Sequence, residues 1–399
     1  MTTLTLSEHK PTPAIALTGD ELDALVRTNI GLVITPTAFQ PGRYDIAPGS
    51  SVGAVALPHL DVVIRPKIGI KRLLFLISYA AHRMKWRAGS PKVDADTDVL
   101  DAIALLFCHS ALQATERGLL RGYCRVNDEL TTIRGRIRMG DLVGRRLGRT
   151  PPIDVSYDVF TADIAENQVL LAAADLLRHL PLRSQAARDQ VSLVWRRLAM
   201  DVHMVGADAS AQIEWHRLNR HYQPAVELGQ LLLRNGSVAI AEGGLEVPSF
   251  VVNMNEVFED FVVAALQDAM RTIDRGLVLD QGAKRRGLAL DVAKKIRLEP
   301  DISVWRGPAC VAIADVKYKR VNAAGVKHPD IYQLLSYLVS TDLAAGMLIY
   351  AKGEADPALH RVVNIDRDLE VVAVDLEQES DDVLDQIDRI AERLVGGTA

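Results

Sequence analysis

The chain has 399 residues, of which 48% are hydrophobic and 24% are charged, and its formal net charge is -5. This composition is typical of a globular protein with a substantial core, and the length favours two or three domains. The slightly acidic balance excludes a uniformly basic nucleic-acid coat protein but allows a local basic groove. Because no apolar run approaches the roughly 20 residues of a membrane helix and no secretory signal is visible, we expect a cytoplasmic protein without a membrane partner.

Periodicity and turn residues divide the chain into three predicted regions. Residues 1–92 are expected to form short strands and turns followed by one helix, whereas residues 93–242 carry helical periodicity. After a Gly- and Pro-containing joint, residues 243–399 alternate helices with strands, which predicts the α/β fold class. The expected helices span 73–83, 99–120, 164–180, 190–200, 223–234, 253–273, 329–340 and 382–395.

One predicted hairpin, at residues 298–317, ends in charged residues. Its second strand ends with Asp315 and Lys317, which share one face because side chains alternate along a strand. A turn at residues 306–308 places Asp301 of the first strand almost opposite Asp315, within the ~5 Å of a cross-strand pair. Two carboxylates and one lysine are therefore predicted to converge where the hairpin leaves the core.

Two carboxylates this close repel each other unless a cation lies between them. A divalent ion that prefers oxygen ligands, Mg²⁺ above all, would remove this conflict, and it could activate a water and stabilise charge on a phosphate. The simpler alternative is a salt bridge between Lys317 and one carboxylate. The position of Asp301, after Pro300 on the facing strand, favours the metal site.

The order Pro300-Asp301, turn, Asp315-Val316-Lys317 resembles the motif of PD-(D/E)XK nucleases. The surrounding sequence resembles one branch of them, the McrC family of modification-dependent restriction subunits. The segments that carry this second resemblance are 64–68, 133–137, 157–163, 167–170, 218–222, 253–262, 315–319 and 330–337. The resemblance implies a C-terminal PD-(D/E)XK restriction-endonuclease-like domain at 243–399, with a central mixed sheet flanked by helices. It would follow an N-terminal β-rich partner-docking domain at 1–92 and a helical middle domain at 93–242.

The resemblance also implies roles for residues of the hairpin. Asp301 and Asp315 would ligate the metal, with the Val316 carbonyl as an extra ligand, and Lys317 would position the water or steady the phosphate. Glu259 matches an acidic residue on the first helix of such folds, which can hold a metal-bound water; its alternative is an exposed helix carboxylate without a catalytic role. The implied cofactor is Mg²⁺, for which Mn²⁺ could substitute.

Further residues are candidates for DNA contact. Gln333 and Tyr337 lie four residues apart on one helix face and match a Gln-x-x-x-Tyr pattern of RecB-like nucleases, although a buried tyrosine bonded to a glutamine would look the same. Basic residues near the presumed site are expected to contact the DNA backbone. They are Lys284, Arg285, Arg286, Lys294 and Lys295.

The chain contains no G-x-x-x-x-G-K-[ST] motif, so we expect this chain itself to bind no nucleotide. In the McrC family a separate McrB-like AAA+ GTPase hexamer binds and translocates the DNA. The N-terminal and middle regions would dock on that ring, with a projecting element in its pore. The arginine-rich stretch 117–149 suits an anionic partner, with Arg134, Arg136 and Arg138 as candidate contacts, whereas a solvated helix and loop is the alternative.

The first hypothesis is a Mg²⁺-dependent DNA endonuclease subunit of a type IV, McrBC-like restriction system. It would dock on and stimulate an AAA+ GTPase, and its substrate would be modified double-stranded DNA. The alternative from another class is a non-cutting adaptor that caps or stimulates a partner AAA+ NTPase, with the nuclease fold as a scaffold. A third hypothesis is a self-sufficient nuclease that cuts without a partner.

Overall fold

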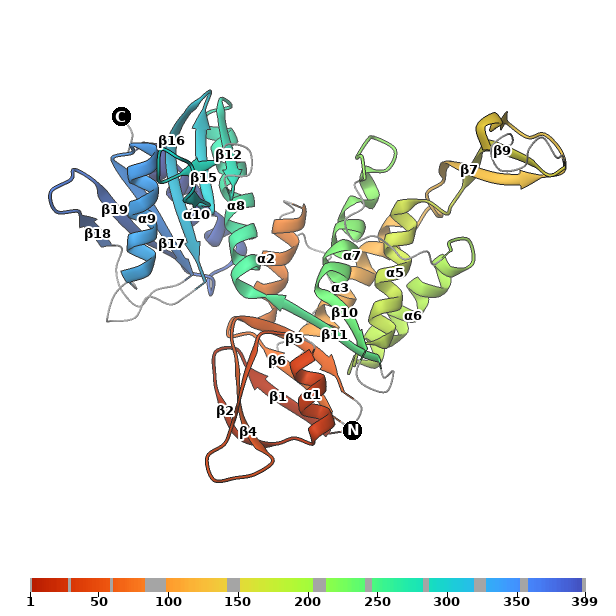
Figure 1. Ribbon diagram of the computed structural model, residues 1–399, viewed down its shortest axis with the longest axis horizontal. Helices are drawn as coiled ribbons and strands as arrows, with labels where there is room; N and C mark the ends of the chain where they lie inside the picture. The colour runs from red at the N-terminus through yellow and green to blue at the C-terminus, as the bar shows by residue number, and fades with distance from the viewer. Residues whose placement is uncertain are drawn as a thin grey trace. The chain divides into compact units, whose positions relative to one another are not determined.

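The computed structural model describes residues 2–27, 30–57, 60–82, 98–141, 151–203, 213–240, 246–282, 287–318, 328–351 and 358–396 (Figure 1). The chain divides into two compact units by its internal contacts. The first unit comprises residues 1–102 and 239–399, and the second comprises residues 103–238. In the part of the chain that the structure describes, no helix is long and apolar enough to cross a membrane.

The first unit contains a five-stranded sheet built from distant parts of the sequence. In sheet order, its strands are β1 (Thr2–Ser7), β6 (Leu60–Arg65), β5 (Ser51–Ala56), β11 (Glu246–Asn253) and β10 (Gly236–Ile240). β1 runs parallel to β6, whereas β5 is antiparallel to both β6 and β11. Strands from the predicted N-terminal and C-terminal regions therefore share one sheet.

A smaller antiparallel sheet and one helix share a core with this sheet. They are β2 (Thr12–Ala16), β4 (Arg43–Pro48), β3 (Leu32–Pro36) and α1 (Gly19–Arg27). Leu25 of α1, Ile46 of β4 and Val62 of β6 are buried together in this core. The strands expected near 30–35, 51–58 and 61–66 are observed as β3, β5 and β6.

A six-stranded mixed sheet forms the other part of the first unit. In sheet order, its strands are β12 (Leu277–Gln281), β15 (Ile302–Arg306), β16 (Ala309–Lys317), β17 (Ala345–Ala351), β19 (Asp368–Val374) and β18 (Ala358–Arg361). β15 and β16 are antiparallel, whereas β16, β17 and β19 are parallel. This arrangement confirms the predicted α/β class.

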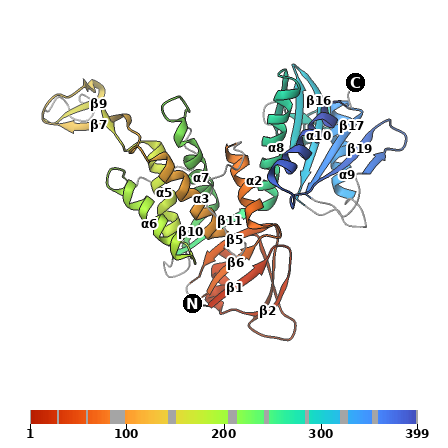
Figure 2. The ribbon, with the colours of Figure 1, turned by 180° about the vertical axis from the view of Figure 1, so that it is seen from behind.

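Helices cover both faces of the mixed sheet, so its central strand β16 is buried. α9 (His328–Thr341) lies on one face, and α8 (Met254–Ile273) and α10 (Ser380–Gly396) lie on the other, as comparison of Figure 1 with Figure 2 shows. A strand covered on both faces requires apolar side chains at successive positions. Ala312, Ile313 and Ala314 meet this requirement, because each is at most 2% exposed.

α8 joins this sheet to the N-terminal part of the unit. The Asn253 side chain caps the helix by accepting a hydrogen bond from the Asn255 N–H at 3.1 Å. On the apolar side of α8, the Phe261 ring packs edge-on against Phe75 and Tyr79 of α2 (Ile70–His82), with ring centroids 5.4 and 5.6 Å away. These aromatic contacts fix α8 where it borders the mixed sheet.

The second unit consists of helices and one long hairpin. Its helices are α3 (Val99–Ala114), which begins in the first unit, α5 (Ala165–His179), α6 (Gln185–Ala199), η1 (Arg220–Tyr222) and α7 (Gln223–Asn235). The strands are β7 (Gly122–Leu130), β9 (Ile153–Thr161) and β8 (Arg136–Ile137), in the order β7-β9-β8. The four α-helices were predicted, although the one expected over 99–120 ends at Ala114, whereas η1 and the three-stranded sheet were not predicted. The apolar residues of this sheet cover no large core, so they give a weak strand signal.

Gly53 marks a close approach of β5 to β11, the strand that leads into α8. Its φ is +148°, and a Cβ at this position would lie 2.0 Å from the Phe250 carbonyl oxygen. We expect Gly53→Ala to lower the free energy of unfolding by about 1–3 kcal/mol, which chemical denaturation would measure. Gly19→Ala is the matched control because nothing lies within 4 Å of its Cβ. Equal unfolding midpoints for the two variants would contradict this steric argument.

Candidate active site

The β15–β16 hairpin brings Asp301, Asp315 and Lys317 together. Ile302 pairs with Ala314, so Asp301, one residue earlier, lies beside the end of β16. The Asp301 Oδ2 accepts a hydrogen bond from the Val316 N–H at 2.7 Å. The Lys317 Nζ forms an ion pair with Asp315 Oδ2 and lies 3.8 Å from Asp301 Oδ2.

Asp315 is the most deeply buried member of this cluster. It is fully buried, whereas the Asp301 and Lys317 side chains are 20% and 18% exposed. Asp315 Oδ1 has no hydrogen-bond donor among the described residues unless one of the two carboxyls is protonated, in which case Asp301 and Asp315 hydrogen-bond to each other. A buried carboxylate oxygen without a hydrogen-bond donor destabilises the folded protein. A bound proton or a cation at this oxygen would remove that destabilisation. The Lys317 salt bridge alone does not satisfy this oxygen.

The charges of the cluster are strongly coupled. Burial, together with the charge of Asp301, raises the pKa of Asp315 to about 7. The pKa of Asp301 is also raised, first by burial and then by the charge of Glu259. Burial would lower the pKa of Lys317, but the charges of Asp315 and Asp301 outweigh it and raise that pKa. The lysine therefore stays protonated while the acids resist ionisation.

Glu259 of α8 belongs to the same electrostatic environment. Its side chain is half-buried, and its Oε1 accepts a hydrogen bond from Gln281 Nε2 at 2.9 Å. Burial raises the pKa of Glu259, and the charges of Asp260 and Asp315 raise it further. Gln281, at the end of β12, holds Glu259 in place, and the sequence patterns had not singled it out.

Gln333 and Tyr337 are hydrogen-bonded to each other on α9. The Gln333 Nε2 donates to the Tyr337 hydroxyl at 2.7 Å, and that hydroxyl donates to the Glu299 carbonyl at 3.2 Å. Tyr337 is 3% exposed, whereas Gln333 is exposed. Tyr337 thus holds the backbone two residues before Asp301, and a DNA contact by this pair stays a prediction.

A second set of residues, which the sequence analysis missed, supports the end of β16. Tyr318 follows Lys317 directly, and its ring lies 5.9 Å from Phe258 of α8 and 3.9 Å from the Lys67 Nζ, measured to the ring centroid. Glu8 accepts a hydrogen bond from the Lys67 N–H at 3.0 Å. Burial raises the pKa of Glu8, while hydrogen bonds from Lys67 and Tyr318 act against this shift. No sequence pattern pointed to Glu8, because this contact joins residues about 310 positions apart.

The predicted basic residues fall in several places. Lys294 and Lys295 are exposed in the loop between the short strands β13 (Leu288–Ala289) and β14 (Arg297–Leu298). Lys284, Arg285 and Arg286 lie outside the described residues.

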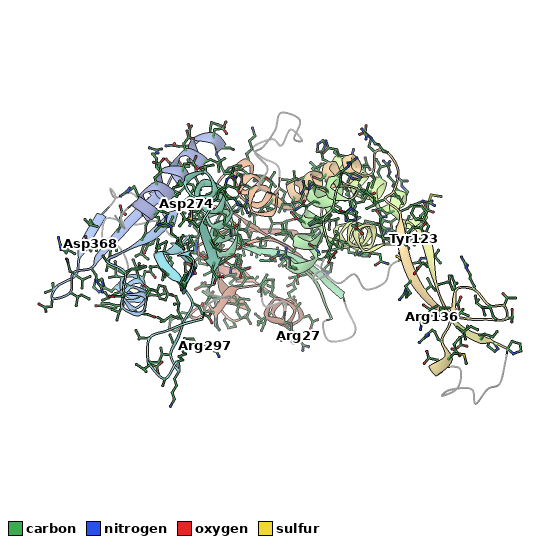
Figure 3. The ribbon with its side chains drawn as sticks, turned by 90° about the horizontal axis from the view of Figure 1, so that it is seen from above. Arg27, Tyr123, Arg136, Asp274, Arg297 and Asp368 are labelled. Carbon is green, nitrogen blue, oxygen red and sulfur yellow. The ribbon has the colours of Figure 1, made fainter. Side chains whose placement is uncertain are left out.

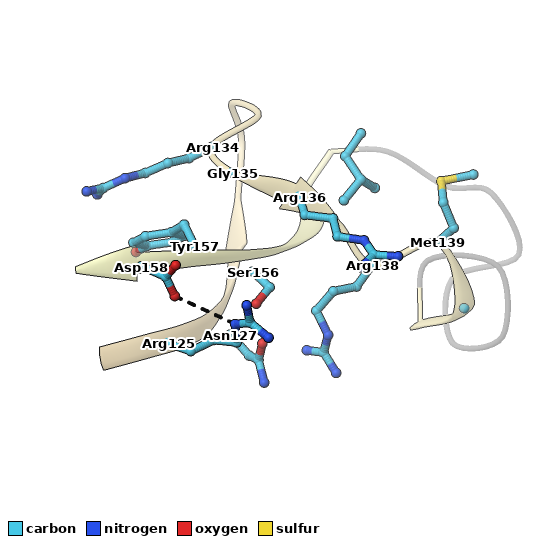
Figure 4. A pocket seen from close by; sticks show the side chains of 12 residues that line it. Arg125, Asn127, Arg134, Gly135, Arg136, Arg138, Met139, Ser156, Tyr157 and Asp158 are labelled. Atoms are coloured by element: carbon cyan, nitrogen blue, oxygen red, sulfur yellow. Dashed lines mark ion pairs between the residues drawn. The ribbon is translucent and has the colours of Figure 1, made fainter. Parts of the chain in front are cut away.

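Arg134, Arg136 and Arg138 lie in the second unit, with Arg136 in β8 and the other two next to this strand. Figure 3 shows Arg136. With Arg125, these three arginines line a hollow of about 1060 Å³, shown in Figure 4, in which Arg125 pairs with Asp158 at 3.6 Å. The Arg134 guanidinium lies 4.1 Å from the centre of the Tyr157 ring. This hollow is the arginine-rich site of the second unit.

The acids of the hairpin fit a magnesium ion better than a zinc ion. Among the described residues, no group of three or more His, Cys, Asp or Glu side chains is placed to hold a metal. Magnesium is commonly bound through one or two carboxylates while it keeps several waters. Asp301 and the unsatisfied Asp315 Oδ1 match that donor set.

Comparisons with known proteins identify the family of this chain. The profile of the family described as "McrBC 5-methylcytosine restriction system component" matches residues 46–351. The chain belongs to this family. No curated protein matches it.

Two solved structures from Thermococcus gammatolerans resemble this McrBC family member. One is a half-complex of a tetradecameric assembly of McrB AAA+ hexamers with bound McrC; its TM-score is 0.61 at 16% identity, over 97% of this chain and 99% of that chain. At this identity the likeness shows a shared fold. The other is a McrBC complex, with a TM-score of 0.42 at 17% identity, over 67% of this chain and 88% of that one.

Because the pKa of Asp315 is raised, replacing this acid with a neutral side chain should increase the free energy of unfolding by an amount that depends on pH. Because the folded pKa exceeds the unfolded value, this group stabilises the fold below pH 4 and loses that contribution as the pH rises through about 7. We expect Asp315→Asn, without divalent ions, to raise the free energy of unfolding by about 1–2 kcal/mol at pH 8 and much less at pH 5. Denaturant titrations at both pH values would measure this. A gain of equal size at pH 5 and pH 8 would contradict the assignment.

Proposed function

We propose that this McrBC family member is a metal-dependent DNA endonuclease subunit of the PD-(D/E)XK class. The observation that carries the proposal is the buried Asp315, which lies beside Asp301 and Lys317 and has a carboxylate oxygen without a donor. Acids whose pKa is raised by burial and by a charged neighbour, as for Asp315 and the partly buried Asp301, cluster at functional sites. The mixed sheet, with helices on both faces and an Asp-x-Lys strand at its centre, supports the same class.

The residues of the cluster have distinct roles in this proposal. Asp301, Asp315 and the Val316 carbonyl would hold Mg²⁺, which, when bound, supplies a Lewis acid for the attacking water and the phosphate. Lys317 stays protonated and can donate to a phosphate oxygen or orient the water. Glu259, fixed by Gln281, can accept a hydrogen bond from a water that enters the site. Tyr337 holds the Glu299 carbonyl and so keeps Asp301 in register.

The chain would work with a separate AAA+ protein. The similar archaeal structure contains McrB AAA+ hexamers with bound McrC, and we propose that this chain docks on a ring of the same kind. The arginine-rich hollow on β7, β8 and β9 supports this proposal, because its cations suit an acidic partner surface. Modified double-stranded DNA is the proposed substrate, consistent with the 5-methylcytosine restriction family.

Substitution of the cluster should abolish DNA cleavage. We expect Asp301→Ala, Asp315→Ala and Lys317→Ala to lower the cleavage rate by more than about 100-fold, since each removes a group that acts on the phosphate or the metal. The assay is plasmid cleavage with Mg²⁺, GTP and the AAA+ partner, on methylated and unmethylated DNA. Asp382→Ala, at an exposed acid of α10, is the control.

The outcomes of this assay separate the competing functions. Full cleavage by any of the three variants would refute the site. Absence of cleavage by the unmodified chain, with stimulated GTP hydrolysis by the partner, would favour the adaptor. Cleavage without the partner would show a self-sufficient nuclease.

Charge reversal in the arginine-rich hollow should weaken docking. We expect Arg136→Glu with Arg138→Glu to lower the affinity for the AAA+ ring at least about tenfold, because acidic groups of the partner would then be repelled. Co-sedimentation and the GTPase rate of the partner would measure this. Arg196→Glu, at an exposed position of α6, is the control, and an equal effect of both changes would contradict the assignment.

A further inference from the structure

The loop between β13 and β14, residues 290–296, forms the tip of a hairpin near the candidate site; we call it the basic tip. After β14, only Glu299 and Pro300 separate the hairpin from Asp301. Figure 3 shows Arg297, at the base of the tip, on a segment that stands out from its surroundings. The hairpin that carries the basic tip therefore leads directly into the segment that holds Asp301.

The base of this hairpin is fixed to the core. Leu288 pairs with Leu298 across the two strands, and both contribute to the apolar core beneath α9. The Ser340 hydroxyl of α9 donates a hydrogen bond to the Ala289 carbonyl at 2.8 Å. Because α9 also holds the Glu299 carbonyl through Tyr337, one helix positions both the hairpin and the approach to Asp301.

The basic tip has a defined backbone conformation. The Leu290 N–H donates to the Ile296 carbonyl at 2.9 Å, and the Lys294 N–H donates to the Asp291 carbonyl at 3.0 Å. The Asp291 side chain accepts the Ile296 N–H at 2.7 Å, so the single acid of the tip is used to close the turn. Lys294 adopts a φ of +55°, a conformation that lysine rarely takes without such restraints.

This ordered tip presents apolar side chains to solvent. Val292 is fully exposed, Ile296 is 54% exposed and Leu290 is 43% exposed. Exposed apolar residues grouped in a short ordered turn indicate a contact surface. Lys294, Lys295 and Arg297 are exposed beside them. Proteins that bind the minor groove of DNA use cationic side chains and frequently insert an apolar side chain that partly unstacks a base step.

A hollow beside the tip provides room for a phosphate backbone. Its volume is about 500 Å³, and its lining includes Gly282, Gly287, Lys294, Arg297 and Glu299. The two glycines carry no side chain, so a bulky backbone can approach closely. Two cations face the one acid, Glu299, which favours an anion over a cation as the occupant.

We propose that the basic tip is a duplex-DNA contact in which Val292 enters a groove, while Lys294, Lys295 and Arg297 bind phosphates. This inference rests on the proposed nuclease function and adds the element that positions the duplex at Asp301 and Asp315. The favoured occupant is DNA rather than a partner protein, because the cations lie on the hairpin that leads within a few residues into Asp301, one of the acids proposed to act on a phosphodiester.

The test uses the complete complex in an Asp315→Asn background, so that binding is measured without cleavage. The probe is a duplex with 2-aminopurine at successive positions, whose fluorescence rises when a base step unstacks. We expect Val292→Ser to abolish this rise. Lys294→Ala with Lys295→Ala should weaken binding about tenfold and reduce the salt slope by about 2. Val363→Ser is the matched control, because Val363 is 80% exposed after β18.

Each result decides the proposal. Loss of the fluorescence rise in Val292→Ser, with Val363→Ser unchanged, supports it. Unchanged fluorescence, DNA affinity and salt slope in the tip variants would overturn the proposal. It would also be overturned if the tip variants lost binding to the AAA+ partner but kept binding to DNA. Cleavage by the Asp315-containing complex is scored separately. Failure of the Asp315-containing complex to cut DNA would therefore contradict the proposed nuclease function. Normal cutting and unchanged DNA binding by the tip variants would contradict only the proposed role of the basic tip.

Discussion

The burial of the Asp315 carboxylate is the constraint on which the rest of the site depends. A fully buried acid next to Asp301 destabilises the ionised state, and Lys317 compensates for one of its oxygens only. Removing Lys317 would leave the two carboxylates without their compensating charge. The hairpin therefore holds two neighbouring carboxylates whose mutual repulsion a cation can relieve, and acids perturbed in this way cluster at functional sites.

Contacts on two sides of the cluster fix the positions of Asp301, Asp315 and Lys317. On the α9 face, Tyr337 fixes the backbone that leads to Asp301. At the other end of the cluster, Tyr318 lies between Phe258 of α8 and Lys67, which in turn binds Glu8 near the N-terminus. The N-terminal sheet is thus a support for the strand end as well as a separate structural layer. This arrangement gives residue 8 a role that its distance in sequence conceals.

The two basic surfaces of the chain have different chemistry. The arginine-rich hollow combines guanidinium groups with an aromatic ring, a combination suited to acidic or planar partner groups. The basic tip combines lysines with exposed aliphatic side chains on a fixed turn. They lie in different compact units, and each unit presents one of them. The division matches our proposals for an AAA+ ring and for DNA.

The sequence by itself determined the hairpin and the alternation that puts Asp315 and Lys317 on one face, because both follow from the local turn and the period of two. The exact pairing of Asp301 beside Asp315 depends in addition on a β-bulge between Val304 and Trp305, which shifts the register by one residue and which no local pattern indicates. The sequence also determined most helices, whose apolar faces repeat locally. The tertiary structure alone decided that β11 joins the N-terminal sheet, that Glu8 reaches the end of β16 and that Tyr337 is buried. These contacts join residues that are distant in sequence, and no local periodicity encodes them. The β7–β9 sheet escaped prediction for a related reason, since it has little core to impose an apolar pattern.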